Sequence, residues 1–318
     1  GVGRERLEKT LNQMKEKLGL KSIDAVLVTH MHGDHVTDAL YLRDQWGAKL
    51  WTLDRVAKVC ANPQNYDYAA MICAYGGIDK CPFDHTFTDG ESFEWEGYKF
   101  TIDWMPGQTE FGCCIQGRID GKLVAFTGDN LFGNPADPAQ NGHEAVVARN
   151  SAIFEEGYIL GADYLKKLNP DIIVGGHSWV MDKPAGMIER FAAWAREIRD
   201  QYQLLSGDED YRWRYDPYWV RAEPYRVKLD PEKDTQFDLV VRNFEKKPTD
   251  VEVYLHGYDI RKIKPLVVRL KMEPETIVRT PITLSPKPMK EPQIICFSII
   301  RNKQPLTPLF DMIVYPAE

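Results

Sequence analysis

Four residues with metal-binding side chains lie within six positions of the chain. His30, His32, Asp34 and His35 follow one another in the segment His30-Met31-His32-Gly33-Asp34-His35. Imidazole and carboxylate groups are ligands that zinc, iron and manganese accept. Two residues apart on an extended segment, His30 and His32 project to the same side, and Asp34 and His35 can approach the same point from the following turn. The segment therefore predicts a metal site.

The elements around this segment are those of an α/β protein. Apolar residues at helical spacing predict a helix over 7–18 that ends near Gly19. The apolar, β-branched run 23–29 predicts a buried strand that leads directly into the metal-binding segment. A second helix over 36–46 and a strand over 49–53 should follow.

Three later segments share one layout, in which an apolar strand ends at a polar residue. The strands and the residues after them are 100–104 before Gln108, 123–127 before Asp129, and 172–174 before His177. Loops at strand ends are where α/β proteins concentrate their chemistry. These residues are therefore candidates for the same site. A hairpin over 87–101 and an apolar helix stripe from Met187 to Leu205 complete this part of the chain.

The metal-binding segment, preceded by Val26-Leu27-Val28-Thr29, resembles the signature of the metallo-β-lactamase superfamily. Gly128-Asp129 is similar to the bridging aspartate of that family, and Gly176-His177 to its last metal histidine. The resemblance covers roughly residues 5–205. It implies a four-layered αββα sandwich with the metals at one edge of the two sheets.

The resemblance also implies a role for each residue. His30 and His32 would bind the first metal, Asp129 would bridge, and the second metal would be bound by Asp34, His35 and His177. In such a site two metals share a hydroxide, which is a nucleophile at neutral pH, and polarise the scissile group. Asp34 could also accept a proton after the attack, as a catalytic residue.

The sequence departs from the family in two places. The usual Pro-Gly-His-Thr reads Pro106-Gly107-Gln108-Thr109, and the amide oxygen of Gln108 is a weaker zinc ligand than imidazole. His143, in the loop 133–150, is the alternative ligand for the first site. Only a helix and one strand precede the metal-binding segment, so we expect the first strands of the family to be missing or replaced by another segment.

Beyond the family resemblance, the chain is predicted to carry a second domain. We expect a metallo-β-lactamase-like domain over 1–206, an aromatic-rich connection over 207–224 that holds the domains together, and a β-sandwich over 225–318. Alternating apolar residues predict strands near 237–241, 251–255, 266–270, 277–284 and 294–300. Several short antiparallel strands over about ninety residues indicate an all-β, immunoglobulin-like sandwich. His256 lies on one of these strands and should be structural, whereas His85 should be a surface or turn residue.

Composition limits the partners. The formal net charge is −7, and we find no cluster of basic and aromatic residues, which argues against a nucleic acid. No run approaches the roughly 18 apolar residues of a membrane span. Six cysteines without a close CxxC pair are expected to be buried thiols. No signal peptide is visible, but the chain opens on Gly-Val-Gly, so a cytoplasmic and an exported location both stay open.

These observations favour a zinc-dependent hydrolase with one or two ions, acting on a small molecule with an ester, amide, lactone, thioester or phosphoester bond. Iron and manganese accept the same ligands. The alternative from another class is a non-catalytic metal- or ligand-binding protein on the same scaffold. A redox enzyme with an iron centre is disfavoured, because position 32 is not the glutamate of the flavodiiron relatives. The sandwich shows no catalytic cluster, and homo-oligomerisation through it stays open.

Overall fold

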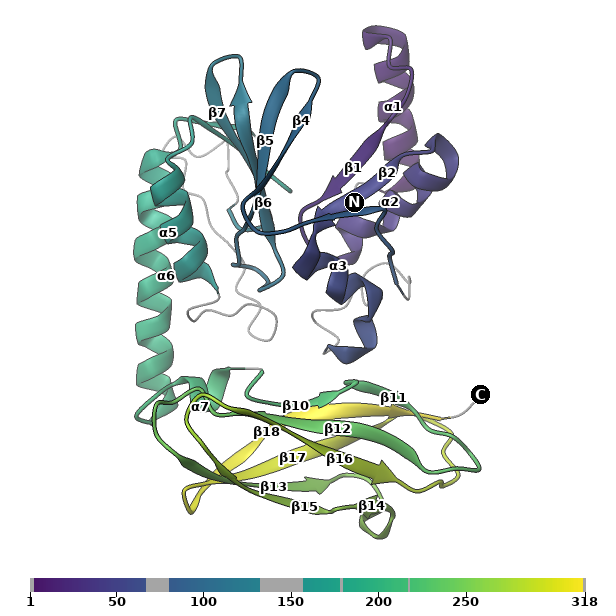
Figure 1. Ribbon diagram of the computed structural model, residues 1–318, viewed down its shortest axis with the longest axis vertical. Helices are drawn as coiled ribbons and strands as arrows, with labels where there is room; N and C mark the ends of the chain where they lie inside the picture. Colours follow the sequence, from purple (N-terminus) through teal and green to yellow (C-terminus); the bar gives the residue numbers. More distant parts are fainter. Residues whose placement is uncertain (1–2, 67–79, 132–156, 178–179, 217, 317–318) are drawn as a thin grey trace. The chain divides into compact units, whose positions relative to one another are not determined.

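The computed structural model describes residues 3–66, 80–131, 157–177, 180–216 and 218–316 (Figure 1). Two compact units divide the chain. Unit 1 comprises Gly1–Pro63 and Tyr68–Tyr202, and unit 2 comprises Gln203–Glu318 with the short segment Gln64–Asp67.

The first sheet of unit 1 is parallel. Its strands are β1 (Ala25–Val28), β2 (Lys49–Leu53) and β3 (His85–Phe87), in that order. The helices of this half are α1 (Arg4–Leu18), α2 (Gly33–Trp46) and α3 (Asp54–Ala61). Both α1 and α2 end at a glycine in the left-handed conformation, as a helix C-cap favours. Within the described residues, β1 pairs only with β2.

Two boundaries in this half differ from the sequence prediction. Helix α2 begins at Gly33, three residues earlier than expected, so Asp34 lies in its first turn. A carboxylate is favoured there by the positive end of the helix dipole. Phe87, the first residue of the hairpin predicted over 87–101, instead belongs to β3, which pairs in parallel with β2 in the first sheet.

The second sheet of unit 1 follows the order of the chain. It runs β4 (Glu91–Trp95), β5 (Tyr98–Trp104), β6 (Cys113–Ile119), β7 (Lys122–Gly128), β8 (Ile172–Gly175) and β9 (Val180–Asp182). Strands β4 to β7 form antiparallel hairpins, two of which turn through residues of positive φ at Glu96-Gly97 and Asp120-Gly121. Strand β8 pairs in parallel with β7 after the helix α5 (Tyr158–Leu168).

Helices α5 and α6 (Ala185–Ser206) lie side by side on the second sheet (Figure 1). Their buried residues, including Tyr158 and Phe191, share one core with Ala125 and Ile173 of the sheet. Leu205 was predicted as part of the apolar stripe of α6 but is 73% exposed, so the stripe ends before the helix does.

The two sheets of unit 1 pack on each other through aromatic side chains. The ring of Trp51 on β2 lies 5.8 Å from that of Phe93 and 5.6 Å from that of Trp95, both on β4. With helices on the outer face of each sheet, unit 1 is the four-layered αββα sandwich that was predicted (Figure 1). Across the described residues, no helix combines the length and apolar character that a membrane crossing requires.

Unit 2 is an all-β, immunoglobulin-like sandwich, as predicted. One sheet has the order β10 (Val220–Glu223), β12 (Thr235–Arg242), β16 (Ile277–Leu284) and β14 (Ile263–Lys264). The other has the order β11 (Arg226–Lys228), β18 (Gln304–Tyr315), β17 (Gln293–Arg301), β13 (Thr249–His256) and β15 (Val267–Met272). Alternate residues of β13 and β17 are buried, which is the pattern of strands with one face on a core.

The aromatic segment 207–224, expected as a connection that holds two domains together, contributes to the interior of unit 2. Trp213 lies on the short helix α7 (Arg212–Tyr215), and Trp219 immediately precedes β10. Both side chains are fully buried in the hydrophobic core of unit 2, with ring centroids 4.8 Å apart. The sequence alone did not assign these two indole rings to either side of the predicted connection, whereas the core of unit 2 holds both.

Candidate metal centre

The predicted site residues come together at the carboxyl ends of the unit 1 strands. His30 and His32 follow β1, and Asp34 and His35 lie in the first turn of α2. The remaining three follow the ends of other strands: Gln108 after β5, Asp129 after β7 and His177 after β8. The loops of both sheets therefore supply the site, as the common layout of these segments predicts.

The first group of potential ligand atoms is buried. His30, His32 and Asp129 each offer one atom, and the three atoms lie within 4.8 Å of one another. His30 Nε2 is 3.2 Å from His32 Nδ1 and 3.6 Å from Asp129 Oδ2. Between the two histidines, Met31 is fully buried and accepts a hydrogen bond from the Thr109 hydroxyl. The extended segment thus turns both imidazoles to one side, as predicted.

The second group lies beside the first and shares Asp129 with it. Asp34, His35, Asp129 and His177 also offer ligand atoms within 4.8 Å of one another. His177 Nε2 is 2.8 Å from Asp34 Oδ2 and 3.2 Å from His35 Nε2, and His35 Nε2 is 3.2 Å from Asp129 Oδ1. The side chains of Asp34 and His177 are 34% and 46% exposed, so this group opens to solvent.

Two glycines leave the space that this crowding needs. A Cβ atom on Gly176 would lie 2.2 Å from Asp129 Oδ1 and 2.8 Å from His35 Cε1. Gly128 has a positive φ of +56°, and a Cβ there would approach the Thr29 side chain to 2.8 Å. The glycines that precede Asp129 and His177 therefore have a steric reason to be glycine.

Burial and mutual proximity keep the imidazoles of the first group neutral. Burial lowers the pKa of His30 well below its ordinary value, and neighbouring His35 lowers it further. Burial also lowers the pKa of His32, although Asp129 opposes this. Partial burial would raise the pKa of Asp34, but the charges of His35 and His177 hold it below its ordinary value. Neutral imidazole and ionised carboxylate are the forms that bind a metal.

The donor set fits a divalent cation. Ring nitrogens that face one another at 3.2 Å cannot both donate a proton, and one or both must present a lone pair. Asp129 Oδ1 is buried, accepts no hydrogen bond and lies 3.2 Å from His35 Nε2. Buried carboxylate oxygens normally have a partner, and a cation held between Asp129 and the neighbouring imidazoles would supply one. The nitrogen and oxygen donors suit zinc, iron or manganese.

Gln108 lies at the site, and its amide nitrogen donates a hydrogen bond to Asp129. Gln108 Nε2 donates to Asp129 Oδ2 at 3.2 Å, and the Gln108 backbone N–H donates to Asn130 Oδ1 at 2.8 Å. His143, the predicted alternative, lies outside the described residues.

The two other described histidines lie away from both groups. His85 starts β3 and packs on Trp51, whereas His256 is hydrogen-bonded to Ser298 in the sandwich, as a structural residue should be.

The described cysteines are free thiols, in agreement with the sequence prediction. Cys60, Cys81, Cys113 and Cys114 are buried and Cys296 is partly buried. Burial raises the pKa of Cys60, Cys113 and Cys114, which keeps them as thiols. Cys73 lies outside the described residues. None of the described cysteines belongs to either group of potential ligands.

The chain belongs to the metallo-beta-lactamase superfamily. The model of that family matches residues 2–177, which is more than half of the chain. The match contains every potential ligand of the two groups. It ends before helix α6 and leaves out residues 203–318 of unit 2.

Individual relatives match shorter parts. The chain is 33% identical over 124 residues to hydroxyacylglutathione hydrolase GloC of Haemophilus influenzae, over 38% of this chain and 56% of that protein. It is 30% identical over 119 residues to a metal-dependent hydrolase of Desulfitobacterium hafniense, over 35% of this chain and 47% of that protein. The chain thus spans about half the length of these curated relatives. Among solved structures, a metallo-beta-lactamase of Cronobacter sakazakii with a HARLDQ motif is 18% identical. That likeness covers 64% of this chain and 82% of the other, with a TM-score of 0.47.

Proposed function

We propose that the protein is a metal-dependent hydrolase whose reaction takes place at the two groups of residues that share Asp129. One observation supports the proposal. Six side chains of unit 1 form two adjacent groups of potential ligands, and Asp129 belongs to both: His30, His32, Asp34, His35, Asp129 and His177. The family membership of residues 2–177 supports it, and so do the hydrolase names of the two curated relatives.

The residues divide into two ligand sets. His30, His32 and Asp129 would hold one cation, with Gln108 as a weak additional ligand. The second cation would be held by Asp34, His35, Asp129 and His177. We propose Zn²⁺ as the cofactor, bound as one or two ions. Iron and manganese accept the same imidazole and carboxylate donors.

A bound divalent cation lowers the pKa of water and polarises the bond to be cleaved. The chain's own residues then determine where the substrate comes in. His30 and His32 are buried, whereas Asp34 and His177 are partly exposed, so a substrate approaches from the side of the second group. Asp34 is both a ligand and the proposed catalytic proton acceptor, because it is the exposed carboxylate at this opening.

The substrate class is a small molecule with a hydrolysable ester, amide, lactone, thioester or phosphoester bond. The Haemophilus influenzae relative is named for hydroxyacylglutathione. Hydroxyacyl thioesters of glutathione are therefore the first substrates to test, followed by lactones and phosphodiesters.

The experiment compares three preparations of one protein batch on this panel: as purified, after chelation, and after chelation with Zn²⁺ added back. We expect hydrolysis of at least one substrate class, its loss on chelation, and its recovery with Zn²⁺. Metal binding without hydrolysis of any class would contradict the enzyme proposal. The protein would then be a non-catalytic metal- or ligand-binding protein on this scaffold.

A further inference from the structure

Asn130 is a buried residue next to the shared aspartate, and sequence reasoning did not single it out. Its side chain is 4% exposed and directly follows Asp129 in the chain. Asn130 Oδ1 accepts the backbone N–H of Gln108 at 2.8 Å. Asn130 Nδ2 donates to the backbone carbonyls of Met105 at 2.9 Å and Pro106 at 3.3 Å. One carboxamide therefore holds three backbone groups of the turn that follows β5.

The space around this turn is closed on two sides. A Cβ atom on Gly107 would lie 2.2 Å from Asn130 Oδ1, so the backbone of the turn rests directly against the asparagine. From the other side, a Cβ on Gly161 of α5 would lie 2.3 Å from the Pro106 carbonyl oxygen. The turn 105–108 is thus held between Asn130 and a helix of the second-sheet layer, with no room to shift toward either.

The fixed turn determines where the Gln108 side chain reaches. From this backbone position Gln108 Nε2 donates to Asp129 Oδ2 at 3.2 Å. The same carboxylate oxygen lies 3.6 Å from His30 Nε2 and 3.4 Å from His177 Nε2, so it faces both groups of potential ligands. A hydrogen bond from Gln108 orients the one carboxylate that the two groups share.

We propose that Asn130 is a positioning residue of the metal centre. It acts by fixing the turn 105–108 and, through Gln108, the orientation of Asp129. This inference rests on the proposed metal-dependent function. It adds that Gln108, which also shares a hydrogen bond with His32, serves as a donor to the shared aspartate, with its approach set by Asn130. Loosening Asn130 would then weaken metal binding although no ligand is removed.

Unit 2 offers a matched control. Asn243 is a buried asparagine, 1% exposed, whose side chain also makes three hydrogen bonds to the backbone. Its Nδ2 donates to the carbonyls of Lys247 at 2.9 Å and Glu273 at 3.0 Å, and its Oδ1 accepts the N–H of Glu245 at 3.1 Å. The two asparagines thus have the same structural function in their loops, but only Asn130 adjoins the potential ligands.

The experiment compares wild type, Asn130→Ser and Asn243→Ser. Each metal-free protein is titrated with Zn²⁺ by calorimetry and with Co²⁺ by visible absorption, and its thermal unfolding is recorded without metal. We expect both variants to melt at a lower temperature than wild type. Only Asn130→Ser should bind metal about 10- to 100-fold more weakly, the usual effect of removing a residue that orients a ligand. Its Co²⁺ spectrum should also change, whereas that of Asn243→Ser should not.

Gly107→Ala provides a second route to the same displacement, because its Cβ would push the Asn130 carboxamide away. We expect it to weaken metal binding as Asn130→Ser does, so the inference stays testable if the serine variant does not fold. Wild-type metal affinity in both Asn130→Ser and Gly107→Ala would overturn the positioning role and leave the proposed function intact. Absence of metal binding by wild type would instead refute the proposed function, and this inference with it.

Discussion

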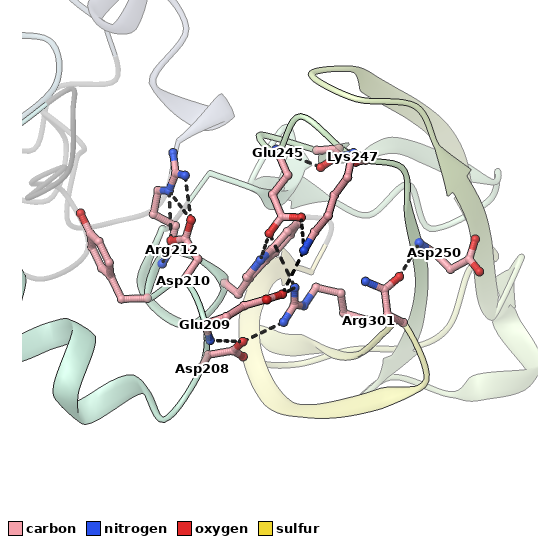
Figure 2. Close-up of polar contacts among 12 residues, drawn as sticks. Asp208, Glu209, Asp210, Arg212, Glu245, Lys247, Asp250 and Arg301 are labelled. Atoms are coloured by element: carbon pink, nitrogen blue, oxygen red, sulfur yellow. Dashed lines mark hydrogen bonds and ion pairs between the residues drawn. The ribbon is translucent and has the colours of Figure 1, made fainter.

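The two units each bury a cluster of charged and polar side chains, and the clusters are built in opposite ways. In unit 2 the guanidinium of Arg301, 3% exposed, lies among opposite charges (Figure 2). Its Nη2 is 2.7 Å from Asp208 Oδ1, its Nη1 is 3.4 Å from Glu209 Oε1, and it lies 4.5 Å from the ring centroid of Trp213. Trp213 Nε1 in turn donates to Glu245. The cation of this cluster is supplied by the chain itself.

In unit 1, imidazoles lie against one another and against carboxylates, in a buried first group and a partly exposed second group. His30 Nε2 faces His32 Nδ1, and His35 Nε2 faces His177 Nε2, each pair at 3.2 Å. Asp129 is the buried carboxylate between them, and one of its oxygens accepts no hydrogen bond. A buried charge requires compensation. Unit 2 provides it with an arginine, whereas we propose that a cation from outside the chain completes the arrangement in unit 1. The predictions below test this contrast.

The largest effects are expected from removing a ligand of the second group. His177→Ala and Asp34→Ala should each lower hydrolysis by at least about 100-fold, because metal and substrate meet at this open side. Both side chains are partly exposed, so unfolding of the metal-free protein should change by less than about 1 kcal/mol. His256→Ala, which removes a histidine bonded to Ser298 in the sandwich, is the control and should keep full turnover. Wild-type turnover in the two site variants with metal removed would contradict the metal-hydrolase account.

Removing the buried arginine of unit 2 should lower stability and leave metal binding unchanged, the reverse of the effect of the ligand substitutions. Arg301→Met removes the buried cation beside Asp208 and Glu245, which keep Arg214 and Lys247 at 3.5 Å, and we expect unit 2 to lose about 3 kcal/mol of unfolding free energy. Metal binding in unit 1 should not change. Arg261, paired with Asp259 but 85% exposed, is the matched control, and Arg261→Met should change stability by less than about 1 kcal/mol. Denaturant unfolding measures both. Equal effects of the two substitutions would show that Arg301 is not the centre of its cluster.

A smaller effect is expected from strengthening the first group. Gln108→His exchanges the hydrogen bond to Asp129 for an imidazole ligand, and we expect the added ligand to outweigh the lost hydrogen bond and to tighten the weaker metal equivalent by about tenfold. Gln116→His is the matched control, since Gln116 Nε2 also donates to an aspartate, Asp103, at 3.3 Å, away from the site. Calorimetric titration with Zn²⁺ compares the two. If affinity is unchanged by Gln108→His, residue 108 does not reach the metal.

The smallest effect concerns the pH dependence of unit 2. Burial would raise the pKa of Asp210, but hydrogen bonds from Arg212 hold it below its ordinary value. A depressed pKa in the folded state contributes stability above the unfolded-state pKa, and this contribution is lost as pH falls through the folded-state value. Arg212→Gln should therefore move the acid unfolding midpoint of unit 2 to higher pH, with a loss of less than about 1 kcal/mol at neutral pH. An unchanged midpoint would refute the role assigned to Arg212.

The potential metal ligands could be predicted because their signals are local. His30, His32, Asp34 and His35 lie in one short segment, and Asp129 and His177 each follow an apolar strand with a glycine between. A parallel or mixed sheet brings such strand ends to one edge, and the resemblance to the metallo-β-lactamase signature implied that these residues share one site. Asn130 gave no such signal. Its role depends on Met105 and Pro106, which lie far from it in the sequence and close to it only after folding.

In the sandwich too, strands with a local sequence pattern could be predicted and strands without such a pattern could not. Strands β12, β13, β15, β16 and β17 could be predicted because each contains a run of apolar and β-branched residues, and along β13 and β17 buried residues alternate with less buried ones. Strands β11 and β14 are only three and two residues long, too short for a periodic pattern. In β18, Pro305 and Pro308 interrupt the alternation that identifies a strand, and its pairing with β17 and β11 cannot be read from its own sequence.

The most direct test of the account is the titration of the metal-free, full-length protein with Zn²⁺, followed by both calorimetry and thermal unfolding. The second group has four potential ligands and the first has three with a weak amide, so we expect two equivalents of unequal affinity. Unit 1 should gain about 3 kcal/mol of stability at a free metal concentration of roughly 100 times the dissociation constant. Two equivalents of equal affinity would contradict the inequality of the groups. No bound Zn²⁺ and an unchanged melting temperature would contradict the metal centre itself.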